Sequence, residues 1–178
     1  MTTFPTRSSR PSRLPSGLRV LGIDPGLLET GWALIEPGPA GVVVLDTGVI
    51  ATGSDAPLEE RVLVIYDGVS DVLARHAPAH LVIEDLYAEY KFPRTALLMA
   101  HARGVVCLAA RQHGADVLAL APAEVKRAVT ANGAASKEQV QQAVRRILRL
   151  EALPRPSHVA DALALAITGY LRLGGPMR

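Results

Sequence analysis

The sequence of 178 residues contains little cysteine, few aromatic residues and no long apolar run. Its single cysteine, Cys107, cannot form an internal disulfide, and its apolar neighbours indicate a buried, unreactive thiol in a reducing compartment. Aromatic residues make up 4%, so the core must consist mainly of Ala, Val, Leu and Ile. No apolar run reaches the ~18–20 residues of a membrane-spanning helix, and the first residues lack an apolar signal-peptide core. We therefore expect a globular, cytoplasmic protein without membrane association.

Acidic residues are absent before Asp24, whereas four arginines precede it: Arg7, Arg10, Arg13 and Arg19. Subtracting these four charges from the net charge of +2 leaves −2, so any nucleic-acid surface must be a local patch. Residues 1–17 are rich in Ser, Thr, Pro and Arg, which predicts a disordered tail. This tail is either an inert extension or an accessory DNA-binding arm. We expect one folded domain over residues 18–174 and a short C-terminal end over 175–178.

Two spacings of apolar residues divide the folded part into strands and helices. Short apolar runs predict strands over 18–23, 31–36, 41–50, 81–84 and 117–120, with a turn at 37–39. Apolar residues at steps of three and four predict helices that open at Pro57, Pro93, Pro122, Ser136 and Ser157. The last two serines are candidate caps, and Ser136 with Gln139 forms a capping-box pattern. The order β-β-β-α-β-α-β-α-α-α predicts an α/β fold, a mixed five-stranded sheet flanked by helices.

Acidic residues stand at the ends of two apolar strands. Asp24 follows the run 20–23 and Glu84 follows 81–83, where a charge costs free energy unless it is paired or metal-bound. Asp161 lies in the first turn of an apolar helix, and His158 is three residues earlier on the same face. Such oxygen-rich sites bind Mg²⁺ or Mn²⁺, and two ions ~3.5–4 Å apart support phosphodiester cleavage. Taken singly, each residue is also compatible with a turn or a helix cap.

Five motifs follow one another along the chain and carry more information together than singly. They are Gly22-Ile-Asp-Pro-Gly26 with Thr30-Gly31, then Val82-Ile-Glu84, His101-Ala-Arg-Gly104, Pro122-Ala-Glu-Val-Lys126, and the helix from His158 to Thr168. In this order and spacing, over about residues 18–172, the chain resembles RuvC-type Holliday junction resolvases.

This resemblance implies a ribonuclease H-like fold and a homodimer with two active sites. It implies a crossover junction endodeoxyribonuclease that resolves four-way DNA by paired symmetric nicks in recombination and repair. It also implies two Mg²⁺ or Mn²⁺ ions per active site and coupling to the RuvA–RuvB branch-migration complex. The expected location is the bacterial cytoplasm, in association with the nucleoid.

The metal-binding acids of the family carry over to Asp24, Glu84 and Asp161. The remaining helix ligand is often a second aspartate, and here that position holds His158. Imidazole keeps a metal-binding group but removes one negative charge, and it suits Mn²⁺ better than Mg²⁺. We therefore expect higher activity with Mn²⁺.

The resemblance also assigns DNA contacts. Tyr87 occupies the place of an aromatic residue that touches DNA near the junction centre, although it is also compatible with a structural ring at the sheet edge. Lys126 and Lys137 match catalytic lysines near the scissile phosphate. Nearby basic residues that extend this surface, or are merely solvated, are Arg127, Arg145 and Arg146. Asp85 is expected to be a neighbour of the site, and it stays open which arginines of the long helix, Arg94, Arg103 and Arg111, face DNA or a partner subunit.

Three other functions are compatible with parts of the sequence. The first motif also resembles the phosphate-binding hairpin of actin-like ATPases and sugar kinases, but those proteins need two lobes and 178 residues are too few. A ribonuclease H-like nuclease that acts on RNA or hybrids is disfavoured by the loop with Tyr87. A protein that binds junctions without cutting them is disfavoured by the complete set of four candidate ligands.

Overall fold

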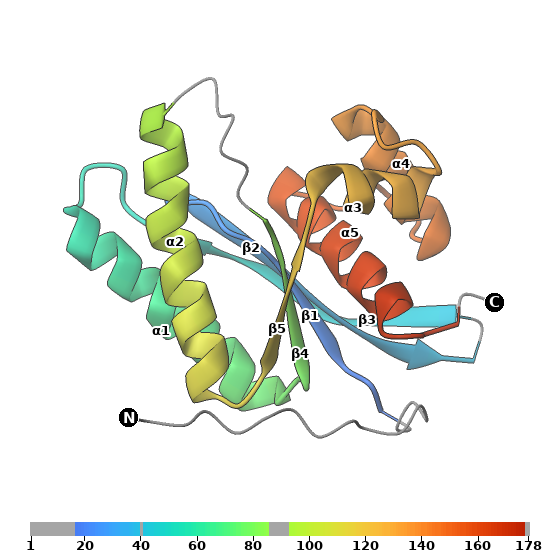
Figure 1. Ribbon diagram of the computed structural model, residues 1–178, viewed down its shortest axis with the longest axis horizontal. Helices are drawn as coiled ribbons and strands as arrows, with labels where there is room; N and C mark the ends of the chain where they lie inside the picture. The colour runs from blue at the N-terminus through green and yellow to red at the C-terminus, as the bar shows by residue number, and fades with distance from the viewer. Residues whose placement is uncertain (1–16, 40, 86–92, 177–178) are drawn as a thin grey trace, which may run out of the picture.

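The computed structural model describes residues 17–39, 41–85 and 93–176, without the side chains of 93–95 (Figure 1). In these ranges the chain forms β1 (Val20–Asp24), β2 (Glu29–Gly38), β3 (Gly41–Ala51), α1 (Leu58–His76), β4 (His80–Glu84), α2 (Pro93–Gln112), β5 (Asp116–Leu120), α3 (Pro122–Thr130), α4 (Lys137–Ile147) and α5 (Ser157–Arg172). The predicted order of strands and helices is confirmed. Among these helices, none combines the length and the apolar character that crossing a membrane requires.

The strands form one mixed sheet in the order β3-β2-β1-β4-β5. The first three strands make an antiparallel meander, and β4 and β5 then add parallel to β1. The parallel pairs need crossover connections, which α1 and α2 supply. The predicted α/β class with a mixed five-stranded sheet is therefore confirmed.

Two local predictions were wrong. The expected turn at 37–39 is still strand at Pro37, which pairs with Val42 of β3. The strand tolerates Pro37 because β2 no longer pairs with β1 beyond Ile35. The N–H group that proline lacks is therefore not needed for a hydrogen bond to β1. Ser157 is the first residue of α5 and makes no cap, since Pro156 takes the N-cap position. The capping box at the start of α4, by contrast, is present as predicted.

Helices cover both faces of the sheet (Figure 1). On one face α5 lies across β1 and β2, and α3 and α4 pack against it; α1 and α2 cover the other face. Successive residues of β1 enter different cores, Val20 on the α5 side and Leu21 on the α1 side. Cys107 on α2 is only half-buried, and burial raises the pKa of its thiol, which agrees with an unreactive cysteine.

Two glycines of the first motif allow α5 to lie very close to the sheet. A Cβ atom on Gly22 would lie 2.1 Å from the carbonyl oxygen of Ala162, and one on Gly31 would lie 2.3 Å from that of His158. Any larger residue would push the helix away from β1 and β2. The motif therefore has a packing role, which is to bring His158 and Asp161 beside the end of β1.

Candidate active site

Asp24 and Glu84 are the last residues of two strands, as predicted. These strands, β1 and β4, are neighbours in the sheet and run parallel. Ile23 of β1 pairs with Ile83 of β4, so the next residue of each strand emerges at the same edge of the sheet. The residues before them are buried, whereas the two acids are only partly so; the side chain of Asp24 is 16% exposed. The apolar strands therefore carry two carboxylates to a rim between the two helical layers.

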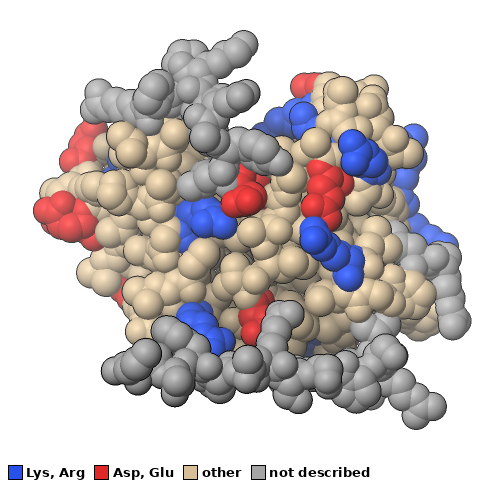
Figure 2. All heavy atoms as spheres, viewed as in Figure 1, with Lys and Arg blue, Asp and Glu red and all other residues tan. Residues whose placement is uncertain are grey.

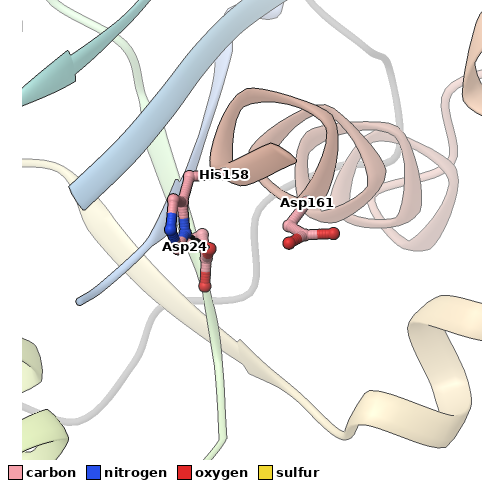
Figure 3. Close-up of side chains that lie close together, drawn as sticks. All are labelled: Asp24, His158 and Asp161. Carbon is pink, nitrogen blue, oxygen red and sulfur yellow. Dashed lines mark hydrogen bonds and ion pairs between the residues drawn. The ribbon is translucent and has the colours of Figure 1, made fainter. Parts of the chain in front are cut away.

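Helix α5 adds an imidazole and a third carboxylate to this rim. One ligand atom each of Asp24, His158 and Asp161 lie within 4.8 Å of one another (Figure 3). Nδ1 of His158 lies 2.8 Å from Oδ2 of Asp24. Glu84 does not belong to this group of three, but it lines the same cleft as Asp24 and Asp161. The structure thus brings Asp24, His158 and Asp161 together and places Glu84 in the same cleft as the two aspartates.

The cleft also contains both lysines that the sequence singled out. Lys126 of α3 and Lys137 of α4 line it opposite the ends of β1 and β4. Nζ of Lys137 lies 2.7 Å from Oδ2 of Asp161. Figure 2 shows acidic and basic side chains next to one another near the middle of one face of the molecule, and in the cleft Lys137 and Asp161 are paired in the same way. Such an arrangement offers carboxylates for a cation and ammonium groups for a phosphate.

The pKa of Glu84 is raised to about 7. Burial is the largest cause, and the negative charges of Asp24 and Asp161 raise this pKa further, whereas Lys126 and Lys137 lower it. Glu84 is therefore about half protonated at neutral pH when no cation is bound. Strongly raised carboxyl pKa values of this kind are enriched at functional sites.

The other ionisable groups of the cleft respond to the same concentration of negative charge. Burial raises the pKa of Asp161, although the ion pair with Lys137 opposes this. The hydrogen bond to Asp24 raises the pKa of His158, and the hydrogen bond to Asp161 raises that of Lys137. Both bases are thus favoured in their charged forms, which means that the carboxylates attract positive charge.

The three arginines that were predicted to contact DNA do not line the cleft. Arg127 on α3 and the pair Arg145 and Arg146 on α4 are exposed. Nε of Arg145 donates a hydrogen bond to the carbonyl oxygen of Leu150 at 3.3 Å, so this arginine also supports the end of α4. Tyr87 lies outside the described residues.

Two residues, Arg103 and Glu29, make contacts at the site that were not predicted. Nε of Arg103 donates to the carbonyl oxygen of Glu84 at 3.2 Å, and its Nη2 lies 3.4 Å from Oδ1 of Asp85. Arg103 therefore holds the end of β4, and Asp85 is a neighbour of the site, as expected. Oε2 of Glu29 lies 3.6 Å from Nε2 of His158. Their places in the sequence could have indicated these contacts, because Arg103 lies within the motif His101–Gly104 and Glu29 directly precedes Thr30-Gly31.

Comparisons with known proteins agree on one family. The family model described as crossover junction endodeoxyribonuclease RuvC matches residues 20–169. Proteins of that name from Rhodopirellula baltica and Mycobacterium avium are 42% and 49% identical, over 89% and 84% of this chain and 89% and 80% of theirs. The solved structure of T. thermophilus RuvC in complex with Holliday junction substrate is similar with a TM-score of 0.81 and 38% identity, and the match covers 88% of this chain and 96% of that one.

Proposed function

The chain belongs to the RuvC family of crossover junction endodeoxyribonucleases, and we propose that Asp24, Glu84, His158 and Asp161 form the site where it cuts four-way DNA. It is a ribonuclease H-like nuclease that resolves Holliday junctions in recombination and repair. The main support for this site is that ligand atoms of Asp24, His158 and Asp161 lie within 4.8 Å of one another. Glu84 lines the same cleft as the two aspartates.

The donor set fits the divalent cations on which this family depends. Three carboxylates and one imidazole are suitable ligands for Mg²⁺ or Mn²⁺. Burial is the largest cause of the raised pKa of Glu84, and repulsion by Asp24 and Asp161 adds to it; a bound cation would relieve this repulsion. We assign two ions to each site, where they would activate a water molecule and stabilise the leaving 3′-oxygen.

Basic residues around the acids would hold the DNA. Lys126 and Lys137 line the cleft, and we assign them to the scissile phosphate. Lys137 would turn from Asp161 toward the phosphate when a metal ion takes its place at the carboxylate, and its half-exposed side chain leaves room for this movement. Arg127, Arg145 and Arg146 would contact phosphates of the DNA arms, and Tyr87 would stack on an unpaired base at the junction centre.

Symmetric nicking of opposed strands needs two active sites, and the outer face of α2 is suited to form the homodimer. Leu97 and Leu108 are 65% and 51% exposed and lie on one face of α2, with Gly104 between them. An apolar strip with a glycine allows a second helix to pack closely. Leu108→Glu should then convert dimer to monomer in sedimentation analysis, whereas Val43→Glu at the far edge of the sheet should not.

Family membership also favours coupling to RuvA–RuvB and a location in the bacterial cytoplasm at the nucleoid. Residues 18–174 would then be the nuclease domain, and residues 1–17 a tail whose contribution to DNA binding is measured by its removal. A protein that begins near Leu18 and retains its junction affinity would exclude a role for this tail as a DNA-binding arm.

Cleavage of a synthetic immobile four-way junction in Mg²⁺ or Mn²⁺ tests the proposed site. Wild type should introduce paired nicks, and Asp24→Asn should bind the junction without cutting it. Linear duplex and RNA–DNA hybrid of the same sequence serve as controls and should remain intact. If wild type binds junctions but cuts none, or cuts hybrid equally well, the proposal fails.

A further inference from the structure

The imidazole ring of His158 lies between two carboxylates that have different surroundings. Its Nδ1 lies 2.8 Å from Oδ2 of Asp24, which belongs to the cluster with Asp161. Its Nε2 lies 3.6 Å from Oε2 of Glu29, which is outside that cluster. One ring nitrogen therefore faces the proposed metal site, and the other faces a carboxylate behind it.

We propose that Glu29 is a positioning residue that accepts the Nε2–H of His158 and so directs Nδ1 toward the metal site. A histidine that binds metal usually donates its second ring N–H to a carboxylate or carbonyl, which sets both the tautomer and the ring orientation. The 3.6 Å separation is within ion-pair range, and a small rotation of either side chain makes it a hydrogen bond. This role rests on the metal site proposed above.

Glu29 belongs to β2, the strand on which Gly31 allows α5 to approach closely. Glu29 and Gly31 are two residues apart on β2, so they face the same side of the sheet. The missing side chain of Gly31 is what allows the backbone of His158 to lie on that side. Between them, buried Thr30 donates a hydrogen bond to the carbonyl oxygen of Gly26 at 2.8 Å, which holds the preceding turn. Backbone pairing and packing thus place the carboxylate beside the ring.

The effect of Glu29 should appear in metal binding rather than in stability. Its side chain is 44% exposed, and an ion pair at such a place contributes little to the free energy of unfolding. Loss of such a supporting carboxylate typically costs ~10–100-fold in metal affinity. Because Glu29 is partly exposed, we expect the lower end of that range.

Mn²⁺ binding to the full chain, measured by isothermal titration calorimetry and by electron spin echo detection of the histidine nitrogen, tests this role. Glu29→Ala should weaken binding about tenfold and diminish the nitrogen signal. Glu29→Gln keeps an acceptor oxygen and should restore much of both. Glu36→Ala is the matched control, because Glu36 is on the same strand but pairs with Arg19. It should leave binding unchanged.

Double variants of Glu29 and His158 show whether Glu29 affects Mn²⁺ affinity through the imidazole ring or independently of it. With His158→Ala, a further Glu29→Ala change should have no effect on Mn²⁺ affinity. With His158→Asp, which removes the ring N–H that Glu29 accepts, Glu29→Ala should change the affinity far less than in wild type. An undiminished loss in the His158→Ala background, or none in wild type, would overturn the role of Glu29. Asp24→Asn should abolish binding; if it does not, the proposed metal site fails and the role of Glu29 with it.

Discussion

Nζ of Lys137 lies 2.7 Å from Oδ2 of Asp161, so the lysine ammonium neutralises a carboxylate that we assign to a metal ion. The lysine side chain is 50% exposed, which leaves it free to move away when another cation arrives. We therefore expect Lys137 to compete with the metal ion in the free protein and to contact the scissile phosphate in the complex with DNA.

Lys137→Met should change metal binding and catalysis in opposite directions. An exposed ion pair contributes ~0.2–1 kcal/mol, so its removal should tighten Mn²⁺ binding by up to about fivefold. Junction cleavage should slow about 100-fold, because the scissile phosphate loses a positive charge. Calorimetry and single-turnover cleavage measure the two effects. Lys126→Met is the matched comparison and should slow cleavage without tightening binding; a parallel fall of both quantities in Lys137→Met would contradict the prediction.

Glu84→Gln should stabilise the metal-free protein at high pH. The pKa of Glu84 is raised from 4.5 to about 7, so folding favours the protonated form, and the free energy of unfolding falls as pH rises between these values. The neutral glutamine avoids this loss, which is at most about 3 kcal/mol above pH 7. Urea denaturation in the presence of a chelator at pH 4.5 and pH 8 checks it. The stabilisation should appear mainly at pH 8, and an equal difference at both pH values would be the contrary result.

His158→Asp should reduce the preference for Mn²⁺. The imidazole of His158 favours Mn²⁺ over Mg²⁺, whereas a fourth carboxylate suits both ions. We expect wild type to cleave faster with Mn²⁺ and the variant to show a several-fold lower ratio of the two rates. Single-turnover cleavage with each metal at saturation measures this ratio. Equal rates in wild type, with the ratio unchanged by the substitution, would show that the imidazole does not select the metal.

Gly22→Ala should destabilise the fold and weaken the metal site together. The new Cβ would lie 2.1 Å from the backbone of Ala162, so α5 must move away from β1 at a cost of ~1–3 kcal/mol or more. Gly53→Ala is the control, because its Cβ would meet Ala56 at an ordinary 3.5 Å; it should change stability by less than ~0.5 kcal/mol. Chemical denaturation and Mn²⁺ titration measure the two effects. Similar stability of both variants would mean that α5 does not depend on the close approach.

Local patterns along the chain are enough to predict the order of the strands and helices and the acidic residues of the site. The apolar runs before Asp24 and Glu84 end at these residues, and that local pattern is sufficient to predict carboxylates at strand ends. The spacing of His158 and Asp161 by one helical turn is equally local. Local pattern was insufficient at Pro37 and Ser157, where neighbouring strands and the preceding proline decide the conformation.

Which side chains touch one another depends on how distant parts of the chain pack together. Lys137 pairs with Asp161, Glu29 faces His158, and Arg103 supports the end of β4. These contacts join residues far apart in the chain, and they depend on distances between elements of a few ångströms. The packing of α5 against Gly22 and Gly31 sets the positions of His158 and Asp161 relative to β1, because close backbone contact leaves little freedom in the separation of helix and sheet. The apolar pattern specifies which faces are buried, whereas close packing specifies the geometry of the site.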